Sequence, residues 1–495
     1  MRLRSIAALA ALLLLVPVAT ASARGSNDDD LRDYARGTWA SFVAMTDADS
    51  GLPADTLRQD GARSVQTSTT NIGAYMWSAV VARRLGIISR RELVNRVSRT
   101  LGTLEGMERS MGGQYFNWYD HRTGEKLTYW PPDRERDPNA PNTFRNWLSS
   151  VDNGWLAVGL RVVQNSVPEL SQRAGDLYRS MDFGVYYVPE RNLVRFHIDP
   201  AAPTDPALSP CCYDTAVSES RIVDYIGISR GQLPPKTYFQ RWRTFPDGCD
   251  WGWQETRPVG VTRTYYGIDV FEGAYPYRGS LVVPSWGGSM FEALMVDLFV
   301  PESDWAPRSW RVNHPLTVRA QMLHGLLDAG YGYWGFSPAN IPEGGYAVYG
   351  VDAIGLDPNG NPSNEDRTLV DHGYPGCPDG RPAQPDPPPS AYTNGVVTPH
   401  AAFLALPYRP QGARANLRRL ARDFPGLYGP WGFRDSVNVQ SKRVSDFYLS
   451  LDQGMIMGAL GNELGGDVLR RAFADGRLER TVRPVIGIEE FGASR

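Results

Sequence analysis

A succession of apolar-periodic segments, separated by glycine- and aromatic-rich loops, most constrains the fold of this chain. In each segment, apolar residues recur three, four and seven positions apart, which is the spacing of one face of an α-helix. Counting the segment at the start, the number of such segments approaches a dozen. They lie at 29–46, 71–86, 89–108, 152–165, 168–182, 215–230, 289–299, 315–329, 398–406, 412–423, 445–461 and 465–473. No short repeat of fixed period is present, which disfavours solenoid repeats.

Polar caps and short connections indicate that consecutive helices form hairpins. The helix at 71–86 leads into the next through SRRE, where Ser89 and Glu92 make a capping box. Long loops such as GGQYFNWYDHRTG and DWGWQETRPVGVTRTYYG separate other helices, and we expect strands to be few and peripheral. About twelve helices in sequential hairpins, with the long loops at one end, predict an all-α fold, an (α/α)6 barrel in one domain over 24–495. An α-solenoid of irregular helix pairs is the alternative.

The first 23 residues have the three parts of a secretory signal peptide. MRLR is a basic start, IAALAALLLLVPVA is an apolar run too short for a comfortable membrane span, and ASA is a cleavage site. Cleavage after Ala23 would leave 472 residues (495 minus 23), and the loss of Arg2 and Arg4 would change the formal charge from -3 to -5. This acidic balance disfavours nucleic acid or an anionic membrane surface as a partner. We expect a secreted or envelope-exterior monomer without integral membrane contact.

The four cysteines, Cys211, Cys212, Cys249 and Cys377, lack metal-ligand spacing. In an oxidising compartment disulfides are the default, and we expect the vicinal pair to bond outward rather than to itself. Cys377 lies in the segment 352–392, whose Pro, Gly and Asp content predicts a long surface loop. A disulfide from Cys377 to one of the other three would hold this loop down.

Metal binding finds little support in the sequence. The spacing of Asp357, Asn359 and Asn361 faintly resembles a calcium loop, but no Glu closes it at the twelfth position, so calcium is disfavoured. The histidines are scattered, and each is better explained as a structural or surface residue: His121, His197, His314, His324, His372 and His400. We expect neither a metal nor an organic cofactor.

A carboxylate at Glu219 falls on the apolar face of the predicted helix 215–230, together with Ile222 and Ile226. Burial of an unpartnered carboxylate raises its pKa, which is what a general acid needs. A capping role is a weak alternative for Glu219, because Asp214 or Thr215 is the more obvious cap. The residues therefore favour a functional role for Glu219.

Two further carboxylates, Asp152 and Glu292, share this feature. Asp152 lies on one face with Trp155, and it has the alternative of being a helix N-cap, which leaves the two interpretations even. Glu292 lies on one face with Val296, but Ser289 and Glu292 fit a capping box, which favours a structural role.

Aromatic residues beside Gly, Asn or Asp indicate what such carboxylates would act on. Flat apolar faces next to hydrogen-bonding side chains suit sugar rings, whose faces carry CH groups and whose rims carry hydroxyls. The candidates for sugar binding are Trp118, Trp155, Trp286, Trp334 and Trp431. The alternative is that such residues fill the ends of a barrel. Other chemistries find less support, because GxSxG, P-loop, dinucleotide and HExxH motifs are absent from the sequence.

Seven stretches, in order along the chain, carry a resemblance to a known family. They are TSTTNIGAYMWSAVVARRLGIISRRE, NWYDHRTG, LSSVDNGWLAVGL, YDTAVSESRIVDYIGISRG, VPSWGGSMFEALM, TNGVVTPHAAFLALPYRP, and GLYGPWGFRDSVN with SDFYLSLDQGM. They span about 67–461, and together they resemble the bacterial glycoamylase-like family, which includes endo-β-1,2-glucanases and the transglycosylating domain of cyclic β-1,2-glucan synthases. The resemblance implies an (α/α)6 barrel and carbohydrate cleavage or transfer without metal or organic cofactor.

The resemblance also implies roles for individual residues. Glu219, in SES, matches the position of the general acid, and Asp152, in SVDN, matches the acidic position opposite it, our candidate for the base. Glu292, in SMFE, and Asp120, in NWYD, match further acidic positions in the pocket. The chain departs from the family at 215–217, where it has Thr-Ala-Val instead of a Leu-Leu-Ala run, and the loop 352–392 and the cysteines look like additions. These departures leave the reaction class better determined than the substrate.

These observations predict a secreted glycoside hydrolase that cleaves internal bonds of a neutral glycan, with β-1,2-glucan as the first polymer to test. In this hypothesis, Glu219 protonates the departing glycosidic oxygen and Asp152 activates water. The mildly acidic chain favours a neutral glycan, and aromatic loops at several points favour attack within a chain. The alternatives are a transglycosylase on the same fold and a non-catalytic glycan-binding envelope protein.

Overall fold

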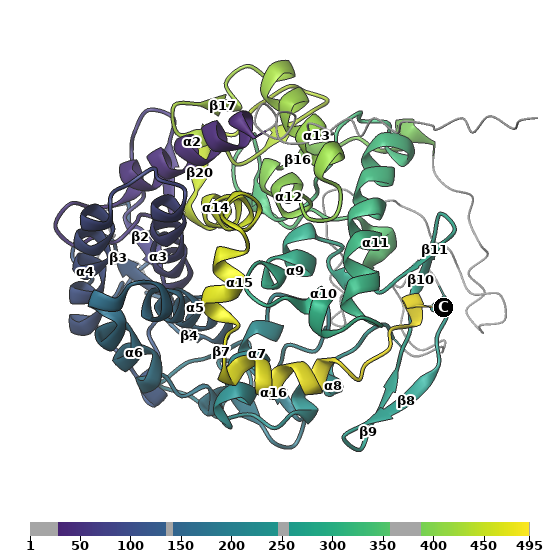
Figure 1. Ribbon diagram of the computed structural model, residues 1–495, viewed down its shortest axis with the longest axis horizontal. Helices are drawn as coiled ribbons and strands as arrows, with labels where there is room; N and C mark the ends of the chain where they lie inside the picture. Colours follow the sequence, from purple (N-terminus) through teal and green to yellow (C-terminus); the bar gives the residue numbers. More distant parts are fainter. Residues whose placement is uncertain (1–27, 135–141, 246–256, 357–387, 495) are drawn as a thin grey trace, which may run out of the picture.

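Helices, often two or three in succession, and short strands make up the part of the chain that the computed structural model describes, residues 28–134, 142–245, 257–356 and 388–494 (Figure 1). The helices are α2 (Asp29–Met45), α3 (Thr69–Arg84), α4 (Arg90–Gly106), α5 (Ser150–Ser166), α6 (Ser171–Ser180), α7 (Arg221–Arg230), α8 (Lys236–Gln240), α9 (Met290–Leu294), α10 (Glu302–Trp305), α11 (Trp310–Leu323), α12 (Pro399–Leu404), α13 (Pro410–Asp423), α14 (Ser450–Gly465), α15 (Val468–Phe473) and α16 (Arg477–Ile486). The expected signal peptide, the calcium-like spacing at 357–361, Cys249 and Cys377 lie outside the described residues. No helix of the described part combines the length and the apolar content needed to cross a membrane.

Helix α3 packs against both α5 and α14. α3 and α14 bury residues on all sides, as expected for helices surrounded by other helices. The backbones of α3 and α5 come close at Gly73 and Gly159, because a Cβ added at Gly159 would lie 2.7 Å from the Cα of Gly73. Only glycine allows this approach of the two backbones.

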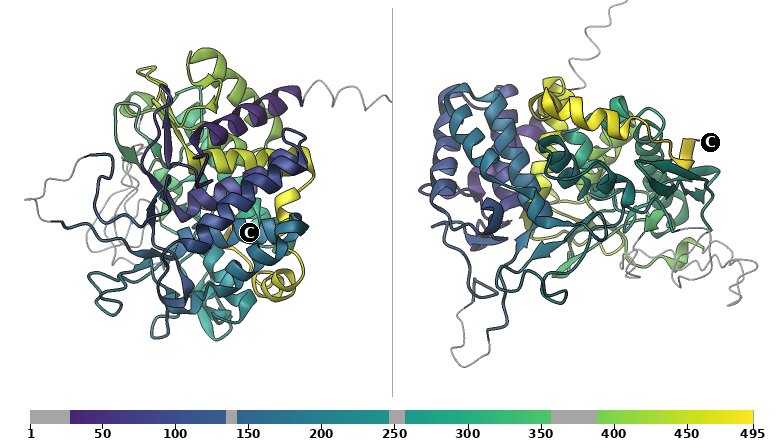
Figure 2. Two further views of the ribbon diagram at one scale, coloured as in Figure 1. Left: turned by 90° about the vertical axis from the view of Figure 1, so that its left-hand side faces the viewer. Right: turned by 90° about the horizontal axis from the view of Figure 1, so that it is seen from below.

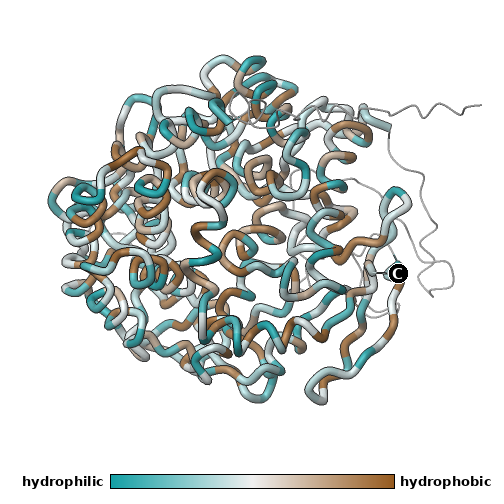
Figure 3. The backbone as a smooth tube through the Cα atoms, viewed as in Figure 1, coloured by the Kyte–Doolittle hydropathy of each residue, from teal (hydrophilic) through white to brown (hydrophobic). Residues whose placement is uncertain are grey.

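Each central helix has a partner on its outer side. α2 packs against α14, α4 against α3, α6 against α5, α16 against α7, α11 against α9 and α13 against α12. These partners are amphipathic: α4 buries Leu93, Val97, Leu101 and Leu104 and exposes most of its other residues. Figure 3 shows the result as alternating brown and teal along the outer helices. α5 also packs against α7, α9 against α12, and α12 against α14.

Short strands connect the helices and pair two by two. The pairs are β1 (Thr56–Arg58) with β20 (Phe447–Leu449), β2 (Gln66–Ser68) with β3 (Trp118–Asp120), β4 (Leu148–Ser149) with β7 (His197–Ile198), β5 (Tyr187–Val188) with β6 (Leu193–Val194), β8 (Thr262–Tyr265) with β9 (Ile268–Phe271), β10 (Tyr275–Tyr277) with β11 (Ser280–Val282), β12 (Ser285–Trp286) with β15 (Gly355–Leu356), β13 (Ala339–Asn340) with β14 (Tyr346–Ala347), β16 (Val396–Val397) with β19 (Val437–Asn438), and β17 (Tyr428–Gly429) with β18 (Gly432–Phe433). All are antiparallel except β12 with β15. In the right-hand view of Figure 2 the helices lie above, and many of the strands and loops lie below them.

Three expectations from the sequence need correction. Strands are not few, because ten two-stranded sheets connect the described helices. The helix expected over 215–230 begins at Arg221, because the backbone of 215–217 pairs with neighbouring segments: Thr215 forms a bridge with Trp242, and Val217 forms one with Ser285. The segment 352–392 is not entirely irregular, since it contributes β15.

The vicinal cysteines also differ from the expectation. Cys211 and Cys212 are joined to each other rather than to a distant partner. Both sulfur-bearing residues pack with Val188 and Leu193 in a small apolar cluster of their own. The two cysteines are therefore bonded to each other and share the same apolar neighbours.

Candidate active site

A cleft of about 840 Å³ collects residues from β1, β2, β3, β13, β14 and β20 and from the first turns of α3, α5 and α14. Its lining combines carboxylates, amides and aromatic rings: Asp55, Arg58, Gln66, Thr70, Asn71, Trp118, Trp130, Asp152, Glu219, Asn340, Tyr346 and Phe447 are among them. The two carboxylates that the sequence singled out as catalytic, Asp152 and Glu219, therefore line one cleft.

Four helices hold a polar side chain near their N-terminus in the same way. The third residues of α3, α5, α9 and α14 are Asn71, Asp152, Glu292 and Asp452. In three of these helices a serine hydroxyl accepts a hydrogen bond from the backbone N–H of that third residue, which is a standard N-cap; the serines are Ser68, Ser149 and Ser289. A helix that begins in this way holds its third side chain close to its own N-terminus.

Asp152 is held by hydroxyl donors on both carboxylate oxygens. Thr70 Oγ1 donates to Asp152 Oδ1 at 2.6 Å, and Ser149 Oγ donates to Asp152 Oδ2 at 2.6 Å. With its amide nitrogen turned toward the carboxylate, Asn117 donates to Asp152 Oδ2 at 3.0 Å and accepts from Trp118 Nε1 at 2.9 Å. Burial raises the pKa of Asp152, while the hydroxyl donors act in the opposite direction. The N-cap of α5 is Ser149, so Asp152 is not the cap itself.

Glu219 lies in the turn that precedes α7, not on a helix face. Trp155 Nε1 donates to Glu219 Oε2 at 2.5 Å. Burial raises the pKa of Glu219 well above its ordinary value, and the neighbouring Glu292 and Asp152 carboxylates raise it further. Glu219 therefore keeps its proton at a pH where an exposed glutamate has lost it.

Glu292 combines a cap with a second contact. Ser289 Oγ accepts from Glu292 N at 3.2 Å, which is the first half of the expected capping box. The Glu292 carboxylate does not complete the box, because its Oε2 accepts from the backbone N–H of Glu219 at 2.7 Å. Burial raises the pKa of Glu292 to about 7. The residue thus connects the first turn of α9 to the segment that carries Glu219.

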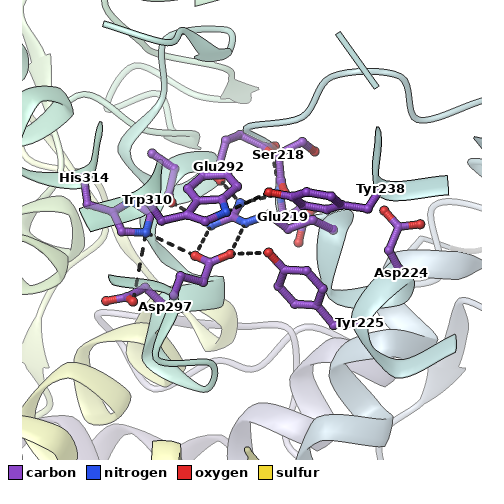
Figure 4. Close-up of polar contacts among 12 residues, drawn as sticks. Ser218, Glu219, Asp224, Tyr225, Tyr238, Glu292, Asp297, Trp310 and His314 are labelled. Atoms are coloured by element: carbon purple, nitrogen blue, oxygen red, sulfur yellow. Dashed lines mark hydrogen bonds and ion pairs between the residues drawn. The ribbon is translucent and has the colours of Figure 1, made fainter. Parts of the chain in front are cut away.

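A buried arginine, Arg221, fixes the turn around Glu219. Figure 4 shows Glu219 near Ser218 and Glu292. Arg221 Nη1 donates to the carbonyl oxygens of Ser218 at 2.7 Å and of Glu292 at 2.8 Å. The same guanidinium binds both oxygens of Glu302, at 2.7 and 2.9 Å, and lies 4.5 Å from the ring centroid of Trp310. Sequence reasoning missed Arg221, although an arginine directly after the SES motif is unusual enough on an apolar helix to be a signal.

A second acidic group lies beside the cleft and was also missed. Asp55 lines the cleft and accepts from Asn71 Nδ2 at 2.8 Å. Asp435 accepts from Asn340 N at 2.5 Å and shares a hydrogen bond with Asp452, whose pKa burial raises to about 7. Asp435 lies in GFRDSVN and Asp452 in SLDQGM, and the latter stretch repeats the Ser-x-Asp-x-Gly pattern of SVDNG around Asp152. That repeat is the signal by which Asp452 can be found.

Two groups of described residues have donor atoms close enough to hold a cation. In the first group, Asp297, Glu302 and His314, the carboxylates already bind Arg470 and Arg221. In the second group, His400 Nδ1 lies 2.7 Å from an oxygen of Asp452, and Asp435 completes the set. Burial lowers the pKa of His400 to about 4, so this imidazole is neutral at ordinary pH. Both groups can be explained by contacts within the protein, and the expectation of no metal stays a prediction.

The remaining predicted residues are spread over different environments. Trp118 lines the cleft, whereas Trp155 is fully buried and reaches it through its indole N–H. Trp334 is 2% exposed and belongs to the core, and Trp431 packs against Tyr448. Trp286 lies in β12, half-buried. The structure places none of these last three among the described residues that line the cleft.

Asp120, the other predicted pocket acid, has its own partner. Arg122 binds both of its oxygens, with Nη2 to Oδ2 at 2.5 Å. Burial raises the pKa of Asp120, but the bonds to Arg122 outweigh it, so that the pKa is lowered overall. Asp120 therefore is charged and paired, next to the cleft-lining Trp118 but outside the described lining.

Two family models match parts of the chain. A family model described as "putative glucoamylase" matches residues 261–475. This match covers less than half of the chain. A second model, for a family of unknown function, matches residues 33–186. The glycoamylase-like resemblance seen in the sequence is therefore confirmed.

The chain is also similar to one curated sequence and to several solved structures. The cyclic β-(1,2)-glucan synthase NdvB of Rhizobium meliloti is 23% identical over 578 residues, which cover 90% of this chain but 18% of the synthase. The endo-β-1,2-glucanase of Chitinophaga pinensis, solved with sophorotriose and glucose, has a TM-score of 0.65 at 17% identity, covering 93% of this chain and 98% of the glucanase. A putative glucoamylase of Bacteroides caccae has a TM-score of 0.64 at 19% identity, covering 93% and 99%. The chain thus has the helix-rich fold of these proteins.

Proposed function

We propose that this chain is a secreted glycoside hydrolase that cleaves internal bonds of a neutral glycan, with β-1,2-glucan as the first candidate. The observation that carries the proposal is that Glu219 and Asp152 line the same cleft. The two carboxylates have different surroundings there. Glu219 receives one side-chain donor and faces Glu292, while Asp152 receives hydroxyl donors on both oxygens. Burial raises the pKa of both groups; the carboxylates near Glu219 raise its pKa further, whereas the hydroxyl donors of Asp152 oppose the rise. Such a difference in surroundings suits a general acid and a general base.

In this proposal, Glu219 donates its proton to the departing glycosidic oxygen and Asp152 accepts a proton from the attacking water. Trp118 and Trp130 present aromatic surface for sugar rings at the same cleft. Residues 1–23, with the pattern of a signal peptide, support secretion. Relatives named endo-β-1,2-glucanase and cyclic β-(1,2)-glucan synthase support the choice of glucan.

We also infer a single (α/α)6 domain over 24–495. The packing of α3, α5, α7, α12, α14 and α9, each with an outer partner, supports six helix pairs. The hydrogen bonds of Arg221 connect α7 to α9, and this connection supports a closed ring of inner helices.

The test is incubation of the purified protein with linear β-1,2-glucan and a panel of other neutral glycans, followed by a reducing-end assay and mass spectrometry. We expect short oligosaccharides and new reducing ends. Glu219→Gln keeps the shape of the side chain but has no proton to give, so turnover should fall roughly 100-fold with an unchanged melting temperature. Glu272→Gln, a buried glutamate outside the described cleft lining, is the matched control and should retain turnover.

The second candidate is a transglycosylase, which the similarity to a glucan synthase favours. Such an enzyme would redistribute chain lengths or close rings while the number of reducing ends does not increase. Release of monosaccharide alone would contradict internal cleavage. Binding of glucan without any change in chain length would favour a non-catalytic glycan-binding protein.

A further inference from the structure

We propose that a second cleft, adjoining the candidate active site, binds the part of the glycan chain that extends beyond the cleaved bond. This cleft has a volume of about 670 Å³ and shares Trp118 and Trp130 with the first. The identity of the ligand rests on the proposed function, but the residues of the second cleft are separate from the catalytic carboxylates. A glycan cut internally has sugar units on both sides of the cleaved bond, so a continuation of the binding surface is needed.

Two aromatic surfaces line the second cleft. Trp130 is 46% exposed, and its ring lies 6.0 Å from that of Phe144 at an interplanar angle of 22°. The rings of Trp147 and His197 lie 5.0 Å apart at 30°. The rings of each pair stack on each other and leave no room for a sugar between them, so a pyranose can lie on an outward face of the stack.

The backbone around these rings is already organised. His197 is paired with Ser149 across β4 and β7, and the backbone N–H of Asn117 donates to Trp147 O at 2.8 Å. Asn146 holds both the N–H and the carbonyl of Trp118, at 3.1 and 2.7 Å. A surface fixed before binding loses little entropy when the ligand arrives.

Polar groups of the second cleft fit an uncharged polyol. Arg145 Nη1 lies 2.8 Å from Asp199 Oδ2, so this pair offers donors and acceptors without net charge. Asn142 and Thr143, both exposed, add neutral hydrogen-bonding groups to the lining. Burial lowers the pKa of His197, so that its ring is uncharged at neutral pH. Hydroxyl groups of a neutral sugar match this set better than a polyanion does.

The proposal is tested with linear β-1,2-glucooligosaccharides from sophorotriose upward. In the wild-type protein, kcat/KM should rise with chain length. Trp147→Ala should lower kcat/KM for long chains by about tenfold, the order of effect of one lost aromatic surface, and leave the value for sophorotriose unchanged. Phe144→Ala, which removes a ring of the other surface, is the second variant and should act in the same way. Tyr266→Ala is the matched control, since Tyr266 is 51% exposed on the β8–β9 hairpin, outside the lining of both clefts.

Binding separates this proposal from the proposed function. Isothermal titration of the Glu219→Gln protein with the same oligosaccharides should give a Kd that falls with chain length, and Trp147→Ala in that background should abolish the fall. If the wild-type protein cleaves no glucan but the Kd depends on length and on Trp147, the proposed function fails and the second cleft stands. If cleavage occurs but neither Trp147→Ala nor Phe144→Ala alters its length dependence, the second cleft is overturned and the function stands. Equal losses on short and long chains would also overturn it.

Discussion

At the scale of single residues, the contact between Glu292 and Glu219 distinguishes this site from an ordinary helix cap. Ser289 caps α9, but the carboxylate of Glu292 accepts from the backbone N–H of Glu219 instead of that of Ser289. The charge of Glu292 is, after burial, the largest cause that raises the pKa of Glu219. A positioning residue of this kind sets how far into the alkaline range the general acid stays protonated.

Glu292→Gln should therefore shift the alkaline limb of the pH dependence of kcat/KM to lower pH. The substitution keeps an oxygen that can accept from Glu219 N but removes the negative charge, so the pKa of Glu219 falls. The measurement is the pH–rate profile on β-1,2-glucan, with Glu272→Gln as the control that should leave the profile unchanged. A limb that does not move, together with a lower melting temperature, would assign Glu292 to helix capping alone.

At the scale of elements, Arg221 joins α7, α9 and α10 behind the cleft. It donates to carbonyl oxygens of Ser218, Glu292 and Ala293 and binds Glu302, the first residue of α10. Tyr225 and His314 also contact Glu302, at 2.7 and 3.1 Å, so that the buried carboxylate is fully surrounded (Figure 4). These bonds lower the pKa of Glu302 to about 2 despite its burial.

Arg221→Met should destabilise the protein by roughly 3–5 kcal/mol, because it leaves the Glu302 carboxylate buried without its main partner. Turnover should fall as well, since the turn that carries Glu219 loses its tie to α9. Urea unfolding and activity assays provide the measurement. The double variant Arg221→Met with Glu302→Leu is the control: it removes both charges and should recover part of the stability but not the activity. A single variant as stable as the wild type would contradict this account.

The sequence predicted the elements best where the signal is local. The capping serines Ser89 and Ser289 act within three residues of the helices they begin, and both patterns were recognised in the sequence. The cap of α5 was assigned to Asp152 in one of the two interpretations, whereas it is Ser149. The start of α7 was misplaced because tertiary pairing decides it: Ala216 N donates to Trp242 O at 2.8 Å, and Trp286 N donates to Val217 O at 3.0 Å. A helical spacing of apolar residues carries no information on such partners.

In the candidate site, too, residues with a local signal were predicted and residues brought together by tertiary contacts were missed. Glu219 and Asp152 stood out because each was placed on the apolar face of a predicted helix. For Glu219 that reason was wrong, since it lies in the turn before α7. Asp55 and Asp435 did not stand out, because they belong to polar loops and meet only when β1 pairs with β20 and Asn340 contacts Asp435. Long-range pairing of this kind brings together segments almost 400 residues apart, and one sequence contains no local sign of it.

At the scale of the whole molecule, buried acids with raised pKa values make the free energy of unfolding decrease as the pH rises. Burial raises the pKa of Glu272 to about 8, and it raises the pKa values of Glu292 and Asp452 to about 7. In the unfolded chain these groups titrate near pH 4, so between that pH and about 7 to 8 the folded protein holds more protons than the unfolded one. The free energy of unfolding then decreases as the pH rises through this range.

We accordingly predict that the free energy of unfolding falls by roughly 2–4 kcal/mol between about pH 6.5 and pH 8.5. The window starts there because His400, with its pKa lowered to about 4, adds stability as the pH rises toward its unfolded value near 6.5 and is constant above it. Urea unfolding at several pH values measures the slope. Glu272→Gln should flatten it, since the group with the highest of the three pKa values no longer loses a proton on unfolding. A stability that rises with pH across this window would show that the buried acids are ionised in the folded protein, and would remove the basis for a protonated Glu219.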